Sequence, residues 1–383
     1  MCIRWISPDC KNAAIPIRRQ EEGLFRCVRR TSFSAETAMP LYHDIRKKLR
    51  YFLSLYKKDM VHPNLQILYQ CNFRCSICDF WKEPYTSCNR LQLDQIRLIT
   101  EKIKYFGPLV ISIGGGEPLL HPDLPEIVRI LAKDNFPVMI CNGWLMTPEK
   151  ARELWKAGMY EISISVDYID PKKHDRQRGV DGAFDRAVHA LKVLQEQRVG
   201  VHQRVHMISV VMDDNIEDIE PLIQLSKRIG VTYLVTLYSN GRGAKASKTK
   251  EKGVSGRLKE LQRKYPEFVS ILGYIDRFSE AIEHNGIKPC YAGKNLFNIG
   301  SQGNVTRCID ALDDSAGNIL IDDMCAIQNN LRRQCEQSPC RGCWTSCRGS
   351  IEPMLYGKNR LRNIISFYQA VKDMPLKIQS HTH

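Results

Sequence analysis

From residue 62 onward, short apolar runs alternate with longer stretches in which apolar residues recur every three or four positions. Short apolar runs predict buried strands, and the longer stretches predict amphipathic helices. The six predicted strands are 65–69, 109–113, 137–141, 160–166, 205–211 and 232–238. The helix-like stretches lie near 92–106, 122–134, 147–158, 181–198, 215–229 and 255–283. This alternation predicts an α/β fold with a parallel sheet, and six units are too few to close an ordinary barrel of about eight strands. We therefore expect an open, TIM-like partial (β/α)6 barrel.

The pattern changes at both ends of this region. Residues 41–58 predict an amphipathic helix with six Lys and Arg around its apolar positions, which are Leu41, Ile45, Leu49, Phe52, Leu53 and Tyr56. Such a helix can lie on a membrane, but more often it packs against the neighbouring fold, which we favour. We predict four segments: a basic N-terminal extension with this helix (1–60), the barrel core (61–284), a small cysteine-rich domain (285–350), and a C-terminal helix and tail (351–383).

The net charge of +14 favours acidic partners, such as nucleic acid, phosphorylated metabolites, an acidic peptide or an anionic membrane face. Residues 1–60 hold 13 Lys and Arg against 6 Asp and Glu, so half of the excess lies outside the predicted barrel. No apolar run approaches the roughly 18 residues that a transmembrane helix needs, and the first residues lack a hydrophobic signal core. We expect a cytoplasmic protein without a transmembrane segment.

Fifteen cysteines in a cytoplasmic chain indicate metal ligation rather than disulfides, because that compartment keeps thiols reduced. Cys71, Cys75 and Cys78 follow the first predicted strand, at the end of a parallel sheet where such folds place their chemistry. A structural zinc site needs about four ligands, whereas this compact group offers three. Thiolates suit iron and sulfur, and a cubane cluster held by three cysteines leaves one iron open to another molecule.

The segment "CNFRCSIC" (71–78) resembles the cluster loop of radical SAM enzymes. In that family three cysteines hold a 4Fe-4S cluster and S-adenosylmethionine binds the fourth iron. Ile77 stands where an aromatic residue is common, which is a minor departure. The segment "ISIGGGEPLLHPDL" (111–124) looks like the GGE motif of the family. The resemblance implies that Glu117 and the backbone of three glycines hold the methionine amino group; these are Gly114, Gly115 and Gly116.

Weaker similarities continue along the barrel. "ISISVD" (162–167) resembles the strand that presents a serine and an aspartate to the cofactor ribose, which implies roles for Ser165 and Asp167. By the same resemblance Arg178 reaches the cofactor carboxylate or the substrate. Each of these residues is also explained as a turn former or a helix cap. Cys141, at the end of the third predicted strand, is a candidate hydrogen-atom donor to a substrate radical, although most spare thiols are small buried apolar groups.

A second group of cysteines lies near the C-terminus. In "CYAGKNLFNIGSQGNVTRC" (290–308), Gly303 and Asn304 predict a hairpin between two strands. Together with "CEQSPCRGCWTSC" (335–347), this segment resembles the auxiliary-cluster extension called SPASM, or its shorter form called twitch. The run C-x2-C-x3-C is shorter than in the full form, so we expect one auxiliary 4Fe-4S cluster. Cys290 and Cys308 are the firmest ligands, and the others come from Cys340, Cys343 and Cys347, with Cys335 in reserve. A zinc ribbon is the alternative.

The resemblance implies an oxidoreductase-type radical SAM enzyme. Such an enzyme cleaves S-adenosylmethionine reductively to a 5′-deoxyadenosyl radical, which abstracts a hydrogen atom from a substrate C–H bond. Family members with this extension oxidise, dehydrogenate, cross-link or epimerise ribosomal peptides, aminosugars or cyclitols. The implied partners are a reductant such as flavodoxin or ferredoxin and a peptide or small-molecule substrate, which the basic charge predicts to be acidic or phosphorylated. The alternatives are a noncatalytic iron-sulfur scaffold or electron carrier, and a zinc protein that binds nucleic acid. We expect no nucleic-acid partner, because the basic residues are not interleaved with aromatic ones.

Overall fold

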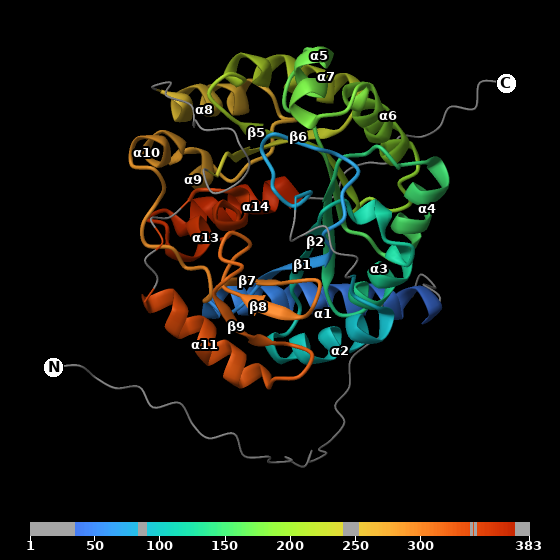
Figure 1. The fold of residues 1–383 in the computed structure, drawn as a ribbon, viewed down its shortest axis with the longest axis vertical. Coiled ribbons are helices and arrows are strands. Elements are labelled where there is room, and N and C mark those ends of the chain that lie inside the picture. Colours follow the sequence, from blue (N-terminus) through green and yellow to red (C-terminus); the bar gives the residue numbers. More distant parts are fainter. Residues whose placement is uncertain (1–34, 83–89, 240–252, 338–339, 341–342, 372–383) are drawn as a thin grey trace, which may run out of the picture. The chain divides into compact units, whose positions relative to one another are not determined.

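One mixed sheet organises the computed structural model, which describes residues 35–82, 90–239, 253–337, 340 and 343–371 (Figure 1). Within these residues the sheet has nine strands in the order β6-β5-β4-β3-β2-β1-β7-β8-β9. The strands are β1 (His62–Leu68), β2 (Val110–Gly115), β3 (Phe136–Cys141), β4 (Glu161–Ser165), β5 (Arg204–Val211), β6 (Thr232–Leu237), β7 (Leu296–Ile299), β8 (Asn304–Thr306) and β9 (Ser315–Asn318). Neighbours from β6 to β1 are parallel, as is β7 to β1. The predicted α/β partial (β/α)6 barrel is confirmed.

Helices follow the barrel strands in sequence and lie outside the sheet (Figure 1). The helices of the barrel are α2 (Leu93–Ile103), α3 (Leu124–Ala132), α4 (Pro148–Ala157), α5 (Pro171–Arg178), α6 (Ala183–Glu196) and α7 (Ile219–Ile229). Short 3-10 helices span Lys104–Phe106, Pro118–Leu120 and Ile216–Asp218. The strands lie between the helices and the barrel interior, and β1 and β5 are almost wholly buried. Burial on both faces explains why these strands read as continuous apolar runs.

Helix α5 is the one barrel helix that the apolar pattern did not predict. Its first turn is capped by Asp170, whose carboxylate accepts hydrogen bonds from the N–H groups of Lys172 and Lys173. It ends at Gly179, which has a φ of +69°. A Cβ at this glycine would lie 2.8 Å from the carbonyl oxygen of Arg74, so only glycine lets α5 approach the loop after β1. Polar composition hid the helix, although its caps were readable.

The single helical stretch predicted at 255–283 is instead three helices, α8 (Val254–Lys264), α9 (Leu272–Ile275) and α10 (Phe278–Glu283). Pro266 is the physical reason, because proline disfavours helical geometry in the residue before it. Tyr265 is accordingly extended, with φ −126° and ψ 107°. The freed segment then runs beside β6, where Tyr233 and Phe268 form a bridge.

Helix α1 (Ala35–Lys57) confirms the predicted N-terminal helix, but not the face by which it packs. Residues 45–383 form one compact unit and residues 1–44 another. In the larger unit, Tyr51 and Leu55 of α1 are buried. The predicted apolar stripe is exposed over its described part, by 39–78% at Ile45, Leu49, Phe52, Leu53 and Tyr56. Most of the basic extension (1–34) and the tail (372–383) lie outside the described residues. No described helix is both long enough and apolar enough to cross a membrane.

The C-terminal residues extend the barrel sheet rather than stand apart from it. β7 pairs with β1, and β7 and β8 form the predicted hairpin around Gly303, which has a φ of +83°. Because β7 lies directly beside β1, the segment that carries Cys290 and Cys308 joins the barrel sheet. The remaining helices are α11 (Met324–Gln337), α12 (Ser346–Gly349), α13 (Glu352–Tyr356) and α14 (Arg360–Val371).

Candidate active site at the mouth of the barrel

The first cysteine group lines a cavity at the end of β1. This barrel cavity has a volume of about 300 Å³, and Cys71, Cys75 and Cys78 all form part of its wall. The loop that carries them is held by the end of α5. The N–H groups of Arg74 and Ser76 donate to the carbonyl oxygens of the last two residues of α5, at 3.2 and 2.9 Å. The loop is therefore anchored to α5, and its three thiols line one cavity.

Burial makes a bare thiolate unfavourable in this loop. It raises the pKa of Cys71 to about 12, and the nearby Glu117, Cys75 and Cys78 add to the shift. A metal-bound thiolate needs positive charge close by, which iron supplies. The environment of Cys71 is thus suited to a bound metal cluster and poorly suited to a free reactive thiol.

The glycine motif locks the cysteine loop against β2. All three glycines line the barrel cavity: Gly114, Gly115 and Gly116. The N–H groups of Gly116 and Glu117 donate to the carbonyl oxygens of Leu68 and Gln70, at 3.0 and 2.8 Å. Cβ atoms at Gly115 and Gly116 would lie 1.8 and 2.0 Å from these same oxygens. Glycine is therefore required at both positions because the backbone of the loop after β1 lies so close. From the sequence, these glycines had instead been explained by contact with a ligand.

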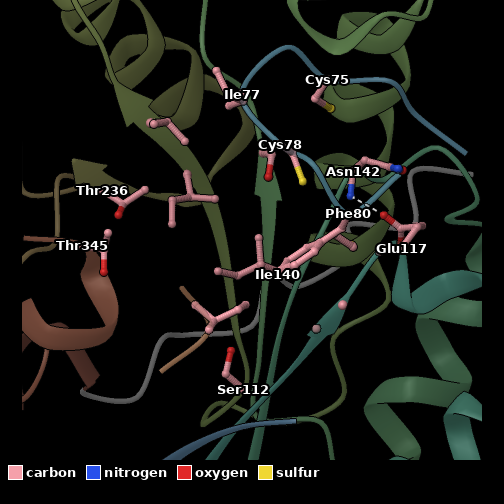
Figure 2. A pocket seen from close by; sticks show the side chains of 18 of the residues that line it. Cys75, Ile77, Cys78, Phe80, Ser112, Glu117, Ile140, Asn142, Thr236 and Thr345 are labelled. Atoms are coloured by element: carbon pink, nitrogen blue, oxygen red, sulfur yellow. Dashed lines mark hydrogen bonds between the residues drawn. The ribbon is translucent and has the colours of Figure 1, made fainter. Parts of the chain in front are cut away.

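Glu117 is a buried carboxylate at the edge of the cavity, with only 1% of its surface exposed. One of its oxygens accepts a hydrogen bond from the N–H of Leu119 at 3.1 Å. The other accepts from the N–H of Asn142 at 2.8 Å (Figure 2). Burial nevertheless raises the pKa of Glu117 to about 7. A cationic ligand beside it would favour its ionised form, so the position suits an ammonium group.

Ser165 and Arg178 line the cavity, whereas Asp167 does not. Asp167 is fully buried and forms an ion pair with Arg178. Its oxygens also accept from the side chain of Gln177 at 2.6 Å and the N–H of Val210 at 2.8 Å. The sequence assigned Asp167 to the cofactor. In the structure it orients Arg178, whose buried Nε has no hydrogen-bond partner among the described residues.

The barrel cavity extends from the cysteine loop to the C-terminal residues. Figure 2 shows Cys75, Cys78 and Glu117 at one end and Ser112 at the other. Four C-terminal residues complete the wall: Ile309, Thr345, Ser346 and Cys347. Cys141 also lines the cavity, where burial raises the pKa of its thiol well above the ordinary range. Its position agrees with the predicted hydrogen donor, which remains a prediction.

The second cysteine group lines a separate C-terminal cavity of about 220 Å³. Five thiols contribute to its wall: Cys290, Cys308, Cys340, Cys343 and Cys347. Burial raises the pKa of Cys290 and of Cys308 to about 12. Cys335 does not line the cavity, and its thiol donates to the carbonyl oxygen of Cys290 at 3.4 Å. Cys347 differs from the other four because it lines both cavities.

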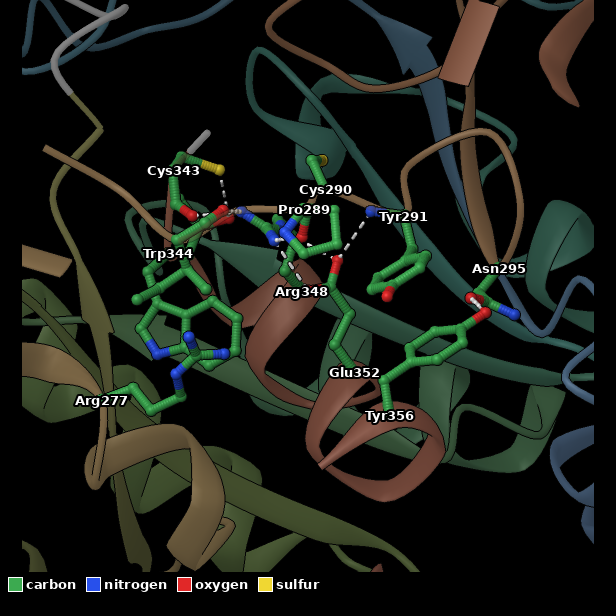
Figure 3. Close-up of polar contacts among 12 residues, drawn as sticks. Arg277, Pro289, Cys290, Tyr291, Asn295, Cys343, Trp344, Arg348, Glu352 and Tyr356 are labelled. Carbon is green, nitrogen blue, oxygen red and sulfur yellow. Dashed lines mark hydrogen bonds and ion pairs between the residues drawn. The ribbon is translucent and has the colours of Figure 1, made fainter. Parts of the chain in front are cut away.

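Arg348 ties together the segments that carry Cys290 and Cys343 (Figure 3). Its guanidinium donates to the carbonyl oxygens of Ile287, Pro289 and Cys343. It also forms a two-pronged ion pair with Glu352, at 2.8 and 2.7 Å, and both side chains are buried. A planar guanidinium suits this fork of acceptors, and lysine has no equivalent geometry.

Residues 65–226 match the family model described as "Radical SAM superfamily". The chain contains a radical SAM domain. Among curated proteins, the AdoMet-dependent heme synthase of Methanosarcina barkeri is 29% identical over 176 residues, which cover 45% of this chain and 49% of that protein. The match thus spans about half the length of this relative. Mycofactocin maturase MftC of Mycolicibacterium smegmatis is 26% identical over 314 residues, which cover 74% of this chain and 76% of MftC.

Solved structures share the radical SAM fold of this chain over most of its length. Streptococcus suis SuiB, bound to precursor peptide SuiA, aligns with a TM-score of 0.56 and 19% identity, over 83% of this chain and 72% of SuiB. Native anSMEcpe with bound AdoMet aligns with a TM-score of 0.57 and 19% identity, over 81% of this chain and 96% of that protein. These likenesses concern the fold.

The radical SAM superfamily uses a 4Fe-4S cluster and S-adenosylmethionine, and the described residues fit both. Cys71, Cys75 and Cys78 are the thiols available to the cluster in the barrel cavity. The buried Glu117 suits the ammonium group of the cofactor, and the unpaired Nε of Arg178 is an available donor for its carboxylate. Each group lies on the same cavity wall as the cysteines.

The sequence did not reveal several residues that shape this radical SAM site. Arg348 and Glu352 follow the last cysteine and are four residues apart. This spacing predicts an ion pair on a helix, but it does not show that the pair is buried. Asn64 and Gln66 occupy alternate positions in an apolar strand, and both line the barrel cavity. Alternation of polar residues within a buried strand was the available signal.

We expect that Glu117→Gln weakens binding of S-adenosylmethionine about 10- to 100-fold, because a neutral amide cannot pair with an ammonium group. Titration calorimetry on the anaerobically reconstituted protein measures this change. Glu153→Gln, on the exposed face of α4, is the matched control and should leave the affinity unchanged. Equal affinities for wild type and Glu117→Gln would contradict the assignment of Glu117.

Proposed function

We propose that this chain is a radical SAM enzyme that cleaves S-adenosylmethionine reductively and abstracts a hydrogen atom from a substrate C–H bond. When bound, the reduced cluster and the cofactor supply the 5′-deoxyadenosyl radical for that step. The observation that carries the proposal is one cavity lined by Cys71, Cys75, Cys78 and Glu117. An electron carrier would not need a buried carboxylate beside three thiols.

The residues of the chain orient the cofactor and keep water out. Glu117 binds the ammonium group, and Arg178, held in place by Asp167, binds the carboxylate. Apolar side chains form part of the remaining wall, including Phe73, Ile113, Ile140 and Ile208. A dry, enclosed site protects a radical from side reactions.

A single auxiliary 4Fe-4S cluster in the C-terminal cavity accords with the SPASM or twitch resemblance. We assign its ligands to Cys290, Cys308, Cys340 and Cys343, which line that cavity without lining the barrel cavity. The sequence placed Cys347 among the candidate ligands. Because Cys347 lines both cavities, we instead assign its thiol to the barrel cavity. Such a cluster offers an exit for the second electron of an oxidation.

A peptide is the substrate class that we favour among peptides, aminosugars and cyclitols. SuiB is described with a precursor peptide, and its fold covers most of this chain. A phosphorylated substrate is less well supported, because Arg178 is the one cation among the described residues of the barrel wall and it is paired with Asp167. Oxidation, cross-linking and epimerisation remain the candidate outcomes, with flavodoxin or ferredoxin as the expected reductant.

The test is anaerobic reconstitution with iron and sulfide, analysis of bound iron, sulfide and zinc, and incubation with S-adenosylmethionine and dithionite. We expect about eight irons per chain and formation of 5′-deoxyadenosine. If the protein binds zinc and only about four irons, the C-terminal cavity holds a zinc ribbon and not an auxiliary cluster. A reconstituted cluster that forms no 5′-deoxyadenosine would overturn the enzyme assignment.

A further inference from the structure

Two buried amide side chains from the same strand lie on the wall of the barrel cavity. Asn64 and Gln66 are two residues apart on β1, so their side chains point to the same face of the sheet. They are 5% and 1% exposed, and both line the cavity. Each has one polar atom without a hydrogen-bond partner among the described residues, namely Nδ2 of Asn64 and Oε1 of Gln66. One is a donor and the other an acceptor.

A chain of hydrogen bonds determines which atom Gln66 presents. The hydroxyl of Thr306 donates to the carbonyl oxygen of Cys308 at 3.0 Å, so it must accept from the Nδ2 of Asn298, at 3.2 Å. The Oδ1 of Asn298 then accepts from the Nε2 of Gln66 at 3.0 Å. Because Nε2 is used, Gln66 turns its carbonyl oxygen to the cavity. The C-terminal hairpin therefore sets the polarity of this wall.

The orientation of Asn64 depends on Cys347. The thiol of Cys347 donates to the Oδ1 of Asn64 at 3.8 Å, which leaves the Nδ2 of Asn64 as the available donor. Asn64 also pairs in register with Ser112, at the end of the cavity away from the cysteine loop. Asn64 thus lies toward the end of the cavity away from the cysteine loop, whereas Gln66 pairs in register with Gly114, the first glycine of the motif.

The surroundings of this amide pair are neutral. Ser112, Thr236 and Ser346 line the same cavity, and the charged residues Glu117 and Arg178 stand beside the cysteine loop. A charged substrate group would find no counter-ion among these described residues. A neutral group that both accepts and donates a hydrogen bond would satisfy both unpaired atoms.

We propose that Asn64 and Gln66 form a subsite for one amino-acid residue of an extended peptide substrate. In an extended chain the C=O and N–H of one residue point to the same side, so the C=O accepts from Asn64 while the N–H donates to Gln66. The inference rests on the proposed function and names the part of the substrate that enters the barrel. It assigns Asn64 and Gln66 to substrate recognition rather than to the cofactor.

Two small probes test the pairing: N-acetyl-L-alanine N′-methylamide (the methylamide) and O-acetyl-L-lactic acid N′-methylamide (the ester). In the ester an oxygen replaces the N–H of the alanine residue, while the C=O of that residue is kept. The dissociation constants of both probes are measured by ligand-observed NMR with the reconstituted full chain and S-adenosylmethionine. A second pair, propanamide and methyl acetate, tests recognition of a primary carboxamide. A buried acceptor left unpaired costs affinity, so we expect the methylamide to bind wild type about 5- to 10-fold more tightly than the ester.

The variants separate the two hydrogen bonds. Gln66→Met should bring the ratio of methylamide to ester affinity close to one, because the acceptor is lost. Asn64→Leu should weaken the binding of both probes by a similar factor, because both keep the carbonyl that Asn64 binds. This variant provides the test of the subsite if Gln66→Met does not fold. Ile140→Val changes the same wall without a polar atom and should preserve the ratio.

An unchanged ratio in Gln66→Met would overturn the subsite. A preference seen for propanamide but absent for the methylamide would overturn the peptide assignment. Loss of S-adenosylmethionine binding in both amide variants would assign these residues to the cofactor instead. Formation of 5′-deoxyadenosine is measured on the same samples, so failure of the proposed function is distinguished from failure of the subsite.

Discussion

Replacing Cys71, Cys75 and Cys78 together by alanine is expected to abolish 5′-deoxyadenosine formation while leaving about four irons bound per chain. The three thiols line the barrel cavity, and no other described cysteine of that wall lies in the loop after β1. Cys290, Cys308, Cys340 and Cys343 line a different cavity, so their iron does not depend on the first group. Product analysis and iron determination on the reconstituted variant measure both effects.

The matched control for this variant is Cys325→Ala. Cys325 lies in α11 and lines neither cavity, so its replacement should change neither iron content nor product formation. If the triple variant loses all of its iron, the two clusters are not independent and the assignment of the C-terminal cavity is wrong. Residual 5′-deoxyadenosine formation in the triple variant would show that the loop does not hold the cluster that cleaves S-adenosylmethionine.

Arg348→Met is the second large effect that we expect, with a loss of about 3–5 kcal/mol in the free energy of unfolding. The substitution leaves the Glu352 carboxylate buried without its partner. It also removes the guanidinium from the carbonyl oxygens of Pro289, which precedes the proposed ligand Cys290, and of Cys343, which is itself a proposed ligand. Iron content should therefore fall from about eight to about four per chain. Urea unfolding and iron analysis check the two effects separately.

A double variant separates the cost of an unpaired buried carboxylate from the loss of the hydrogen bonds that hold the cysteine segments. Arg348→Met with Glu352→Leu removes both charges and should recover part of the lost stability, because no unpaired carboxylate remains. It cannot restore the hydrogen bonds to the backbone of the cysteine segments, so the auxiliary iron should stay low. Full stability and full iron content in Arg348→Met would show that the pair has no role in holding this module.

Local patterns in the sequence were enough for the barrel and for the first cluster loop. All six predicted barrel strands are present, because largely buried strands have mostly apolar sequences. The loop "CNFRCSIC" carries all three thiols within eight residues, so the chain connectivity itself keeps them close. Glu117 was equally readable, since it follows three glycines directly after a strand.

Long-range contacts account for what the pattern missed. Asp167 and Arg178 are eleven residues apart, and their pairing arises only when α5 folds back on the end of β4. The apolar stripe of α1 predicted the wrong packing face, because periodicity shows that a face is apolar but not what covers it. Pro266 was visible, yet the position of the following segment beside β6 depends on sheet pairing.

Which cysteines share a cavity is likewise a tertiary property. Cys290 and Cys343 are far apart in sequence, and Arg348 brings their segments together by bonds to both backbones. Cys347 of α12 and Asn64 of β1 are 283 residues apart in sequence, yet they lie within hydrogen-bonding distance. Thus the amino-acid pattern alone established the barrel, the three-thiol loop and the nearby carboxylate, because each is encoded within a few consecutive residues. The polarity of the barrel-cavity wall and the separation of the two cysteine cavities were decided by the tertiary structure, because the residues involved are far apart in sequence and meet only in the folded chain.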